Sequence, residues 1–200
     1  MIRRYLPGVK IAEAIYGPEF APGIDILTPV VNEYEKHKEW YDKCTELGHE
    51  LYSYVCCGPR GFWLNRFLDV PLVNGRLLFW GCAANRITGW LTWGFNMFEC
   101  TPNPFESTLG IVPDGSMHSW PCGDAFYVYP GDDGPWLGMR LEAERRGFED
   151  AALLRALYEK DPQGHDELVA KVFTSFSEYD NDVEKMELVH KELLERLSRN

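Results

Sequence analysis

The sequence has no run of about 18 uncharged apolar residues, which excludes an ordinary membrane-spanning helix. Residues 1–8 carry two arginines with no long apolar stretch behind them. We therefore expect no secretory signal peptide and, by default, a cytoplasmic location. Basic residues are also scarce, since 20 Lys and Arg face 31 Asp and Glu and give a net charge of −11. Because nucleic-acid phosphates select basic protein faces, we expect neither a nucleic-acid nor a membrane partner.

The 200 residues have a composition typical of a globular chain, with 45% hydrophobic and 26% charged residues. Aromatic residues reach 14%, and the seven tryptophans are many for this length. Such a content indicates either a thick core or a flat surface on which a ligand stacks. Composition alone leaves both interpretations open.

The six cysteines include no C-x-x-C pair, although Cys56 and Cys57 are adjacent. A chain of this size does not need disulfides for its stability, so buried free thiols are the simpler interpretation. His118 and Cys122 are four positions apart, but no second ligand pair lies near them in the sequence. We therefore expect no metal site. We expect no cofactor either, because the sequence has no P-loop and no G-x-G-x-x-G motif after a strand.

Strands alternate with helices along the first part of the chain, and this order is typical of an α/β fold with a parallel sheet. The segments rich in β-branched and aromatic residues are expected to be strands, with a short fifth one at 126–129. Apolar periodicity predicts the helices between them. The expected strands are Val9–Ile15, Ile24–Val31, Glu50–Cys57 and Ile87–Phe95, and the expected helices are 32–47 and 72–84.

The second part of the chain begins with a long segment, 96–138, that is predicted to be a functional loop or lid. Three helices are expected after it, at 139–160, 165–176 and 183–197. We divide the chain into residues 1–160 and a helical C-terminal extension, 161–200.

Candidate binding residues lie where two expected strands end, because ligands of parallel α/β folds bind beyond the carboxyl ends of strands. Aromatic rings stack on the apolar faces of sugars, and amides bind hydroxyl groups. Tyr54, Trp93 and Asn96 are therefore candidates for a sugar site, with Asn65 and Trp90 as weaker members. The alternative is that these rings fill the core between sheet and helices, and both interpretations stay open for the cluster.

No residue is assigned a catalytic role. The sequence has no G-x-S-x-G motif, and no histidine has an obvious nucleophile or ligand neighbour. Asp132 and Asp133 fit a turn, where Asp is favoured. The carboxylate pairs 149–150 and 166–167 fall in amphipathic helices, where solvated side chains are the default.

Several blocks resemble one enzyme family when they are taken together in order. The chain is similar to the C-terminal part of the catalytic domain of glycoside hydrolase family 123, from about residue 5 to residue 160. The blocks are 54–59, 65–69, 76–80, 89–96, 124–131 and 140–150.

The resemblance implies a (β/α)₈ barrel that removes β-linked N-acetylgalactosamine with retention of configuration. It implies that the substrate's acetamido group is the nucleophile, an exception to the scheme with two carboxylates. It also implies an Asp-Glu pair, in which Asp orients the acetamido group and Glu is the acid and base. That pair is expected upstream of the strand at Val9, so it is absent here. A complete barrel also needs about 250 residues.

We therefore expect the C-terminal half of a barrel, which has no activity alone and whose bare sheet edges pair with another chain. That chain is expected to be a second copy or a separately encoded N-terminal half. Two other functions stay open, a non-catalytic carbohydrate-binding or assembly protein and a relic that folds only by pairing its edges.

Overall fold

A computed structural model describes residues 2–111 and 118–199 of the chain. Its centre is a parallel sheet of four strands in the order β1-β2-β3-β4. The sheet confirms the predicted α/β class, although every strand is shorter than expected. The strands are β1 (Ala12–Ile15), β2 (Ile26–Pro29), β3 (Glu50–Val55) and β4 (Gly89–Thr92).

The helices of the first part begin with the short α1 (Ile2–Tyr5), and the 3₁₀ turn Pro18–Phe20 precedes β2. The helix expected at 32–47 is divided into α2 (Val31–Lys36) and α3 (Lys38–Glu46). His37 ends the first and begins the second, because its backbone leaves the helical region, with φ −119° and ψ 25°. The helix α4 (Val73–Ala84) is buried along almost its whole length, as its apolar composition predicts.

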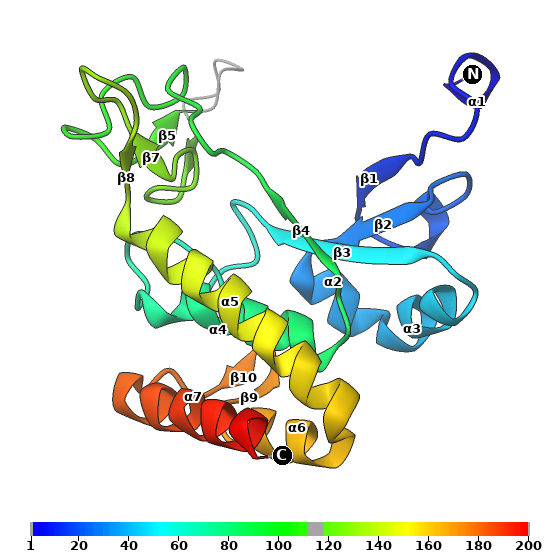
Figure 1. Cartoon of the computed structure of the whole chain (residues 1–200). Coiled ribbons are helices and arrows are strands. Elements are labelled where there is room, and N and C mark those ends of the chain that lie inside the picture. The colour runs from blue at the N-terminus through cyan, green and yellow to red at the C-terminus, as the bar shows by residue number, and fades with distance from the viewer. Residues whose placement is uncertain (1, 112–117, 200) are drawn as a thin grey trace.

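Side chains of the sheet alternate between two faces, and the helices from α2 onward lie on one of them (Figure 1). Leu27, Leu51 and Val55 point to the helical side and join the main core with Leu77 and Trp80 of α4. Tyr52 and Tyr54 point to the opposite side of β3, since side chains alternate along a strand. The two faces of the sheet therefore have different surroundings.

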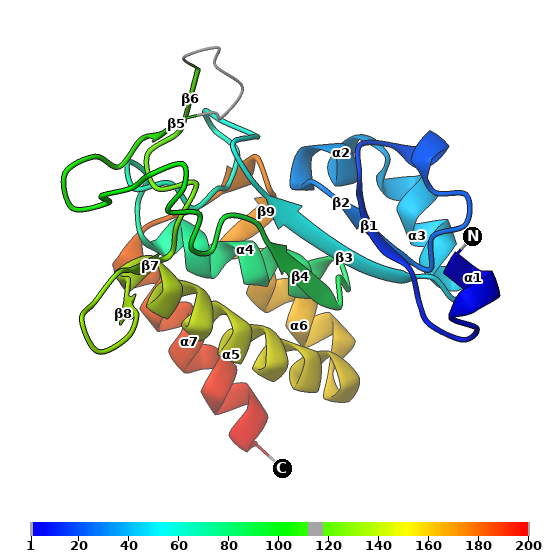
Figure 2. The same cartoon turned by 90° about the horizontal axis from the view of Figure 1, so that it is seen from above.

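The C-terminal part packs on α4 (Figure 1 and Figure 2). It comprises α5 (Met139–Lys160), α6 (Pro162–Val169) and α7 (Val183–Ser198). The buried carboxylate of Asp150, on α5, accepts from Trp80 Nε1 of α4 at 2.7 Å and lies 2.9 Å from Nδ1 of His190 of α7. Buried residues of α6 and α7, among them Leu168 and Met186, belong to the main core. Residues 161–200 thus share one core with residues 1–160.

The helix expected at 165–176 is wrong in its second half. The helix α6 ends at Val169, and the chain forms a hairpin of β9 (Phe173–Ser175) and β10 (Glu178–Tyr179). The Ser175 hydroxyl accepts from the backbone N–H groups of Ser177 and Glu178. Such local bonds compete with a helix.

The segment 96–138 carries two small hairpins, and its residues 112–117 lie outside the described part. One hairpin pairs β5 (Gly110–Ile111) with β6 (Ser119–Trp120), and the other pairs β7 (Val128–Tyr129) with β8 (Trp136–Leu137). The predicted fifth strand is therefore β7, but it is not part of the main sheet. A second small core of Cys100, Ala125 and Phe126 holds the segment together.

The main sheet does not close into a barrel within the residues that the structure describes, since β1 and β4 are its two edges. The expected half-barrel is thus not confirmed, and what the structure gives is a parallel four-stranded sheet with C-terminal helices. None of the described helices is long and apolar enough to cross a membrane.

Candidate functional site

A hollow of about 440 Å³ lies beside the segments that follow β3 and β4. This volume falls in the range of small-molecule sites, roughly 300–1,000 Å³. One wall comes from the connection between β3 and α4, and the other comes from the segment 96–138. The side chains that line it include Arg60, Trp63, Asn65, Phe67, Asp69 and Trp120.

Asn65 fixes the turn that forms one wall. Its side-chain amide donates to the carbonyls of Cys56, at 3.1 Å, and Pro59, at 2.8 Å. Its Oδ1 accepts from the backbone N–H of Arg66 at 2.7 Å. Because the residue is 1% exposed and its amide is already bonded, Asn65 positions the chain rather than offering a free amide to a ligand.

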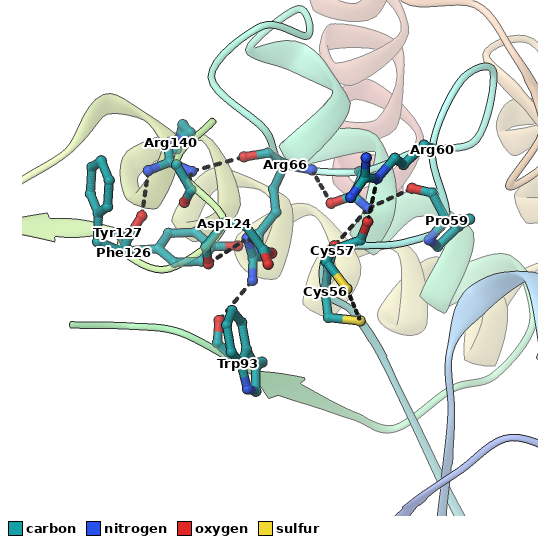
Figure 3. A network of polar contacts seen from close by, with 12 residues as sticks. Cys56, Cys57, Pro59, Arg60, Arg66, Trp93, Asp124, Phe126, Tyr127 and Arg140 are labelled. Atoms are coloured by element: carbon teal, nitrogen blue, oxygen red, sulfur yellow. Dashed lines mark hydrogen bonds and ion pairs between the residues drawn. The ribbon is translucent and has the colours of Figure 1, made fainter. Parts of the chain in front are cut away.

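Arg66 joins three segments at the strand ends (Figure 3). One guanidinium nitrogen donates to Asp124 Oδ1 at 3.1 Å and to the Asp124 carbonyl at 3.2 Å, and the other donates to the Trp93 carbonyl at 2.7 Å. The side chains of Arg66 and Asp124 are 1% and 0% exposed. This buried ion pair therefore fastens the segment 96–138 to the ends of β3 and β4.

Arg140 extends the same network from α5. It donates to the carbonyls of Arg66, at 3.0 Å, Gly123, at 2.8 Å, and Phe126. Burial, and then the neighbouring Arg66, lower the pKa of Arg140 to about 10. The Tyr127 ring lies 4.8 Å from the Arg66 guanidinium and 5.2 Å from that of Arg140, so cation–π contacts help to hold both.

Two buried carboxylates complete the network. Burial raises the pKa of Asp124, although Arg66 opposes the shift, and Oδ2 of Asp124 has no hydrogen-bond partner among the described residues. Burial also raises the pKa of Glu144 to about 8, and this carboxyl group accepts from the Tyr127 hydroxyl. Glu144 is therefore largely protonated at neutral pH.

The sulfur atoms of Cys56 and Cys57 are 4.0 Å apart at the end of β3. Burial, and then Cys56, raise the pKa of the Cys57 thiol to about 11, so Cys57 carries little thiolate at neutral pH. All six cysteines are free, and Cys44, Cys82 and Cys100 are buried as predicted, whereas the other three are half-buried. The part of the chain that the structure describes contains no group of three or more potential metal ligands.

Two of the predicted site residues lie near the hollow without offering free polar groups to it. Asn65 is part of its wall, as described above. Trp93 is half-buried, and its ring meets that of Trp120 edge-on, with 4.7 Å between the ring centroids. Trp93 therefore supports a ring that lines the hollow.

The other three predicted residues lie elsewhere. Trp90 packs against Phe79 of α4, with 5.2 Å between ring centroids, so it is on the helical side of the sheet. Tyr54 is on the opposite face and buried, and burial and a hydrogen bond with Tyr16 raise the pKa of its hydroxyl. Asn96 is exposed and forms a backbone bridge with Phe126. None of the three lines the hollow, and their contact with a sugar stays a prediction.

Of the six lining side chains named above, sequence reasoning missed five, namely Arg60, Trp63, Phe67, Asp69 and Trp120. Four of them belong to residues 60–69, directly after β3, where arginine, aromatic residues and a carboxylate occur together. That composition is the signal that could have found them. Trp120 carries no such signal, because only the folding of 96–138 brings it to the strand ends.

Residues 1–157 match the family model described as the glycoside hydrolase 123 catalytic domain. The chain belongs to glycoside hydrolase family 123. Its fold is also similar to that of a family 123 glycoside hydrolase from Clostridium perfringens, solved in work on glycolipid glycan hydrolysis, with a TM-score of 0.63 at 21% identity. The match covers 94% of this chain and 34% of that one, so this chain spans about a third of its structural relative. The comparison with curated proteins gave no match.

The family 123 chain should lose stability as the pH rises from about 5 to 8 and level off above that range. Folded Glu144 has a pKa of about 8 against a normal value of 4.5, so between these values the folded state holds a proton that the unfolded chain has released. The slope from one such group is at most about 1.4 kcal/mol per pH unit. Urea unfolding between pH 5 and 9 measures it.

Glu144→Gln keeps a neutral side chain of the same shape and should reduce this slope. Glu159→Gln, an exposed change on the same helix, serves as the control and should leave it unchanged. Equal slopes in the wild type and Glu144→Gln would show that Glu144 is ionised in the folded protein.

Proposed function

We propose that this chain supplies part of the carbohydrate site of a family 123 enzyme, whose substrate is a glycan ending in β-linked N-acetylgalactosamine. The hollow at the strand ends carries this proposal. Its tryptophans, Trp63 and Trp120, offer rings for the apolar face of a sugar, and Arg60 and Asp69 offer polar groups for hydroxyls. This combination of rings and polar groups is the chemistry that sugar binding requires.

We further propose that the four-stranded sheet is part of a (β/α)₈ barrel. The sequential order of its parallel strands and the helices on one face support this, and so does the similarity in fold to the clostridial enzyme. In a barrel the carboxyl ends of all the strands meet at one end. The hollow would then be one side of a larger pocket.

The chain alone is proposed to be inactive. Acid catalysis of glycoside cleavage needs a carboxylic acid at the leaving oxygen, and the acetamido mechanism needs a second carboxylate to orient the nucleophile. Asp69 is the one carboxylate that lines the hollow within the described residues. Asp124 is fully buried and paired with Arg66, and Asp166 and Glu167 belong to α6.

Trp120→Ala should weaken binding of methyl β-N-acetylgalactosaminide about two- to tenfold, because a stacked ring contributes roughly 0.5–1.5 kcal/mol. Trp136→Ala is the matched control, since Trp136 is 60% exposed on β8 and does not line the hollow. Isothermal titration calorimetry measures both. Equal affinities in the two variants would contradict a sugar site at the hollow.

The purified chain should not release nitrophenol from 4-nitrophenyl β-N-acetylgalactosaminide above the rate of its Asp69→Asn variant. Spectrophotometric assays at several pH values test this. Turnover that disappears on changing one carboxylate would contradict the proposed inactivity.

A non-catalytic carbohydrate-binding protein is the second candidate, and the single carboxylate in the hollow favours it. It predicts the same loss of binding in Trp120→Ala. The two candidates differ in hydrolytic activity when another chain supplies further strands. A binding protein stays inactive, whereas an incomplete enzyme gains turnover.

We also propose that the chain associates with a second copy or with a chain that supplies further strands. The edge strands β1 and β4 leave backbone groups unpaired, and exposed edges favour pairing between chains. Apolar side chains near β1 are exposed as well, among them Val9, Tyr16 and Phe20. Size-exclusion chromatography with light scattering should report a dimer or a larger species. A stable monomer at micromolar concentration would contradict this proposal.

A further inference from the structure

A second cavity lies at the opposite end of the sheet from the hollow, where α4 ends and the chain turns toward β4. It measures about 90 Å³, whereas a water molecule needs roughly 10–15 Å³ by the same measure. Room therefore exists for a small ion of several heavy atoms, but not for a sugar chain. Polar side chains from three helical regions line it, namely Arg86, Thr88, Arg155, Tyr158 and His165.

The two arginines of this cavity are unusual in a protein with a net charge of −11. Within the described part of the chain, neither Arg86 nor Arg155 forms an ion pair, and the Arg86 guanidinium lies 5.9 Å from the Tyr158 ring centroid. Both side chains are exposed, so they line the open side of the cavity. Two cations that converge on one small cavity without a counterion leave a positive local field.

The backbone of Arg86 provides a separate observation. It has φ 54°, the only positive φ of a described residue other than glycine. Arg86 follows the last turn of α4, where the N–H of Arg86 bonds the carbonyl of Ala83 at 3.1 Å and that of Ile87 bonds the carbonyl of Cys82 at 2.9 Å. This is the helix-ending motif whose left-handed position normally carries glycine. Glycine would adopt this conformation at lower cost, so the arginine side chain is a candidate for a role here.

His165 contributes a third polar group. It is 2% exposed, its Nδ1 donates to Asp166 Oδ1 at 2.9 Å, and no described residue bonds its Nε2. This bond to Asp166, which does not line the cavity, fixes the orientation of the imidazole ring. Its Nε2 is therefore left to contact a ligand in the cavity.

We propose that this cavity binds a small tetrahedral oxyanion, with inorganic phosphate as the ion of suitable size and charge. Guanidinium groups bind phosphate oxygens through paired N–H donors, and the Tyr158 hydroxyl adds a further donor. The site is independent of the sugar hollow, and its ligand is a free ion because an ester substituent exceeds the volume. Occupancy would tie the turn after α4, which carries Arg86, to α5 and α6, which carry Arg155 and His165.

The test is calorimetric titration of the 200-residue chain with sodium phosphate at pH 7, at an ionic strength held constant with sodium chloride. One phosphate should bind per chain, and phenyl phosphate should bind at least tenfold more weakly. Arg86→Gly should weaken phosphate binding at least tenfold, while its unfolding midpoint without phosphate stays equal or rises because glycine relieves the positive φ. Arg155→Gln should weaken binding similarly.

Arg145→Gln is the control, because it removes the same charge from the exposed side of α5. It should bind phosphate as the wild type does. Absence of phosphate binding to the wild type, equal binding to all three variants, or phenyl phosphate binding as tightly as phosphate would overturn the proposal.

Discussion

The buried ion pair between Arg66 and Asp124 is the interaction on which the candidate site depends. It joins the connection after β3, the carbonyl that follows β4 and the segment 96–138, and all of its groups are shielded from water. Breaking such a pair leaves an uncompensated buried charge and costs about 3–5 kcal/mol. The segment 96–138 otherwise has a small core of its own, formed around Cys100 and Phe126. Without Arg66, Arg140 would still bond the carbonyls of Gly123 and Phe126, but the link from the segment to the Trp93 carbonyl would be lost.

The parallel sheet could be predicted from the sequence, because alternating apolar residues and intervening helices are local signals. The side of the sheet that each strand residue faces could not be predicted. Trp90 and Trp93 are three residues apart, yet Trp90 packs on α4 and Trp93 supports Trp120. Sequence reasoning cannot decide which face of a strand meets the helices when both faces carry aromatic rings. The prediction of a helix at 165–176 was wrong in its second half. There the Ser175 hydroxyl bonds the backbone, and Phe173 and Phe176 are buried in the core.

Polar partners distant in the sequence were also beyond prediction. Arg66 and Asp124 are separated by 58 positions, and nothing in either neighbourhood marks the other. Asn65 was expected to bind a ligand, but its amide bonds to the turn at 56–59. The residue types alone do not show whether a polar side chain bonds to another part of the protein or stays free for a ligand. Only the fold decides this. Membership of family 123 followed from the order of several blocks, which is a property of the whole chain.

Hydrogen exchange measured by mass spectrometry on Asp124→Asn tests the role of this ion pair most directly, because the substitution keeps the shape and removes the charge. Arg66 would lose its counterion, so exchange should accelerate in residues 93–100 and 118–128 while α4 and α5 stay as protected as in the wild type. Asp133→Asn, an exposed change in the same segment, is the control and should leave exchange unaltered. Unchanged protection in both segments of Asp124→Asn would contradict the account, and so would a uniform loss over the whole chain.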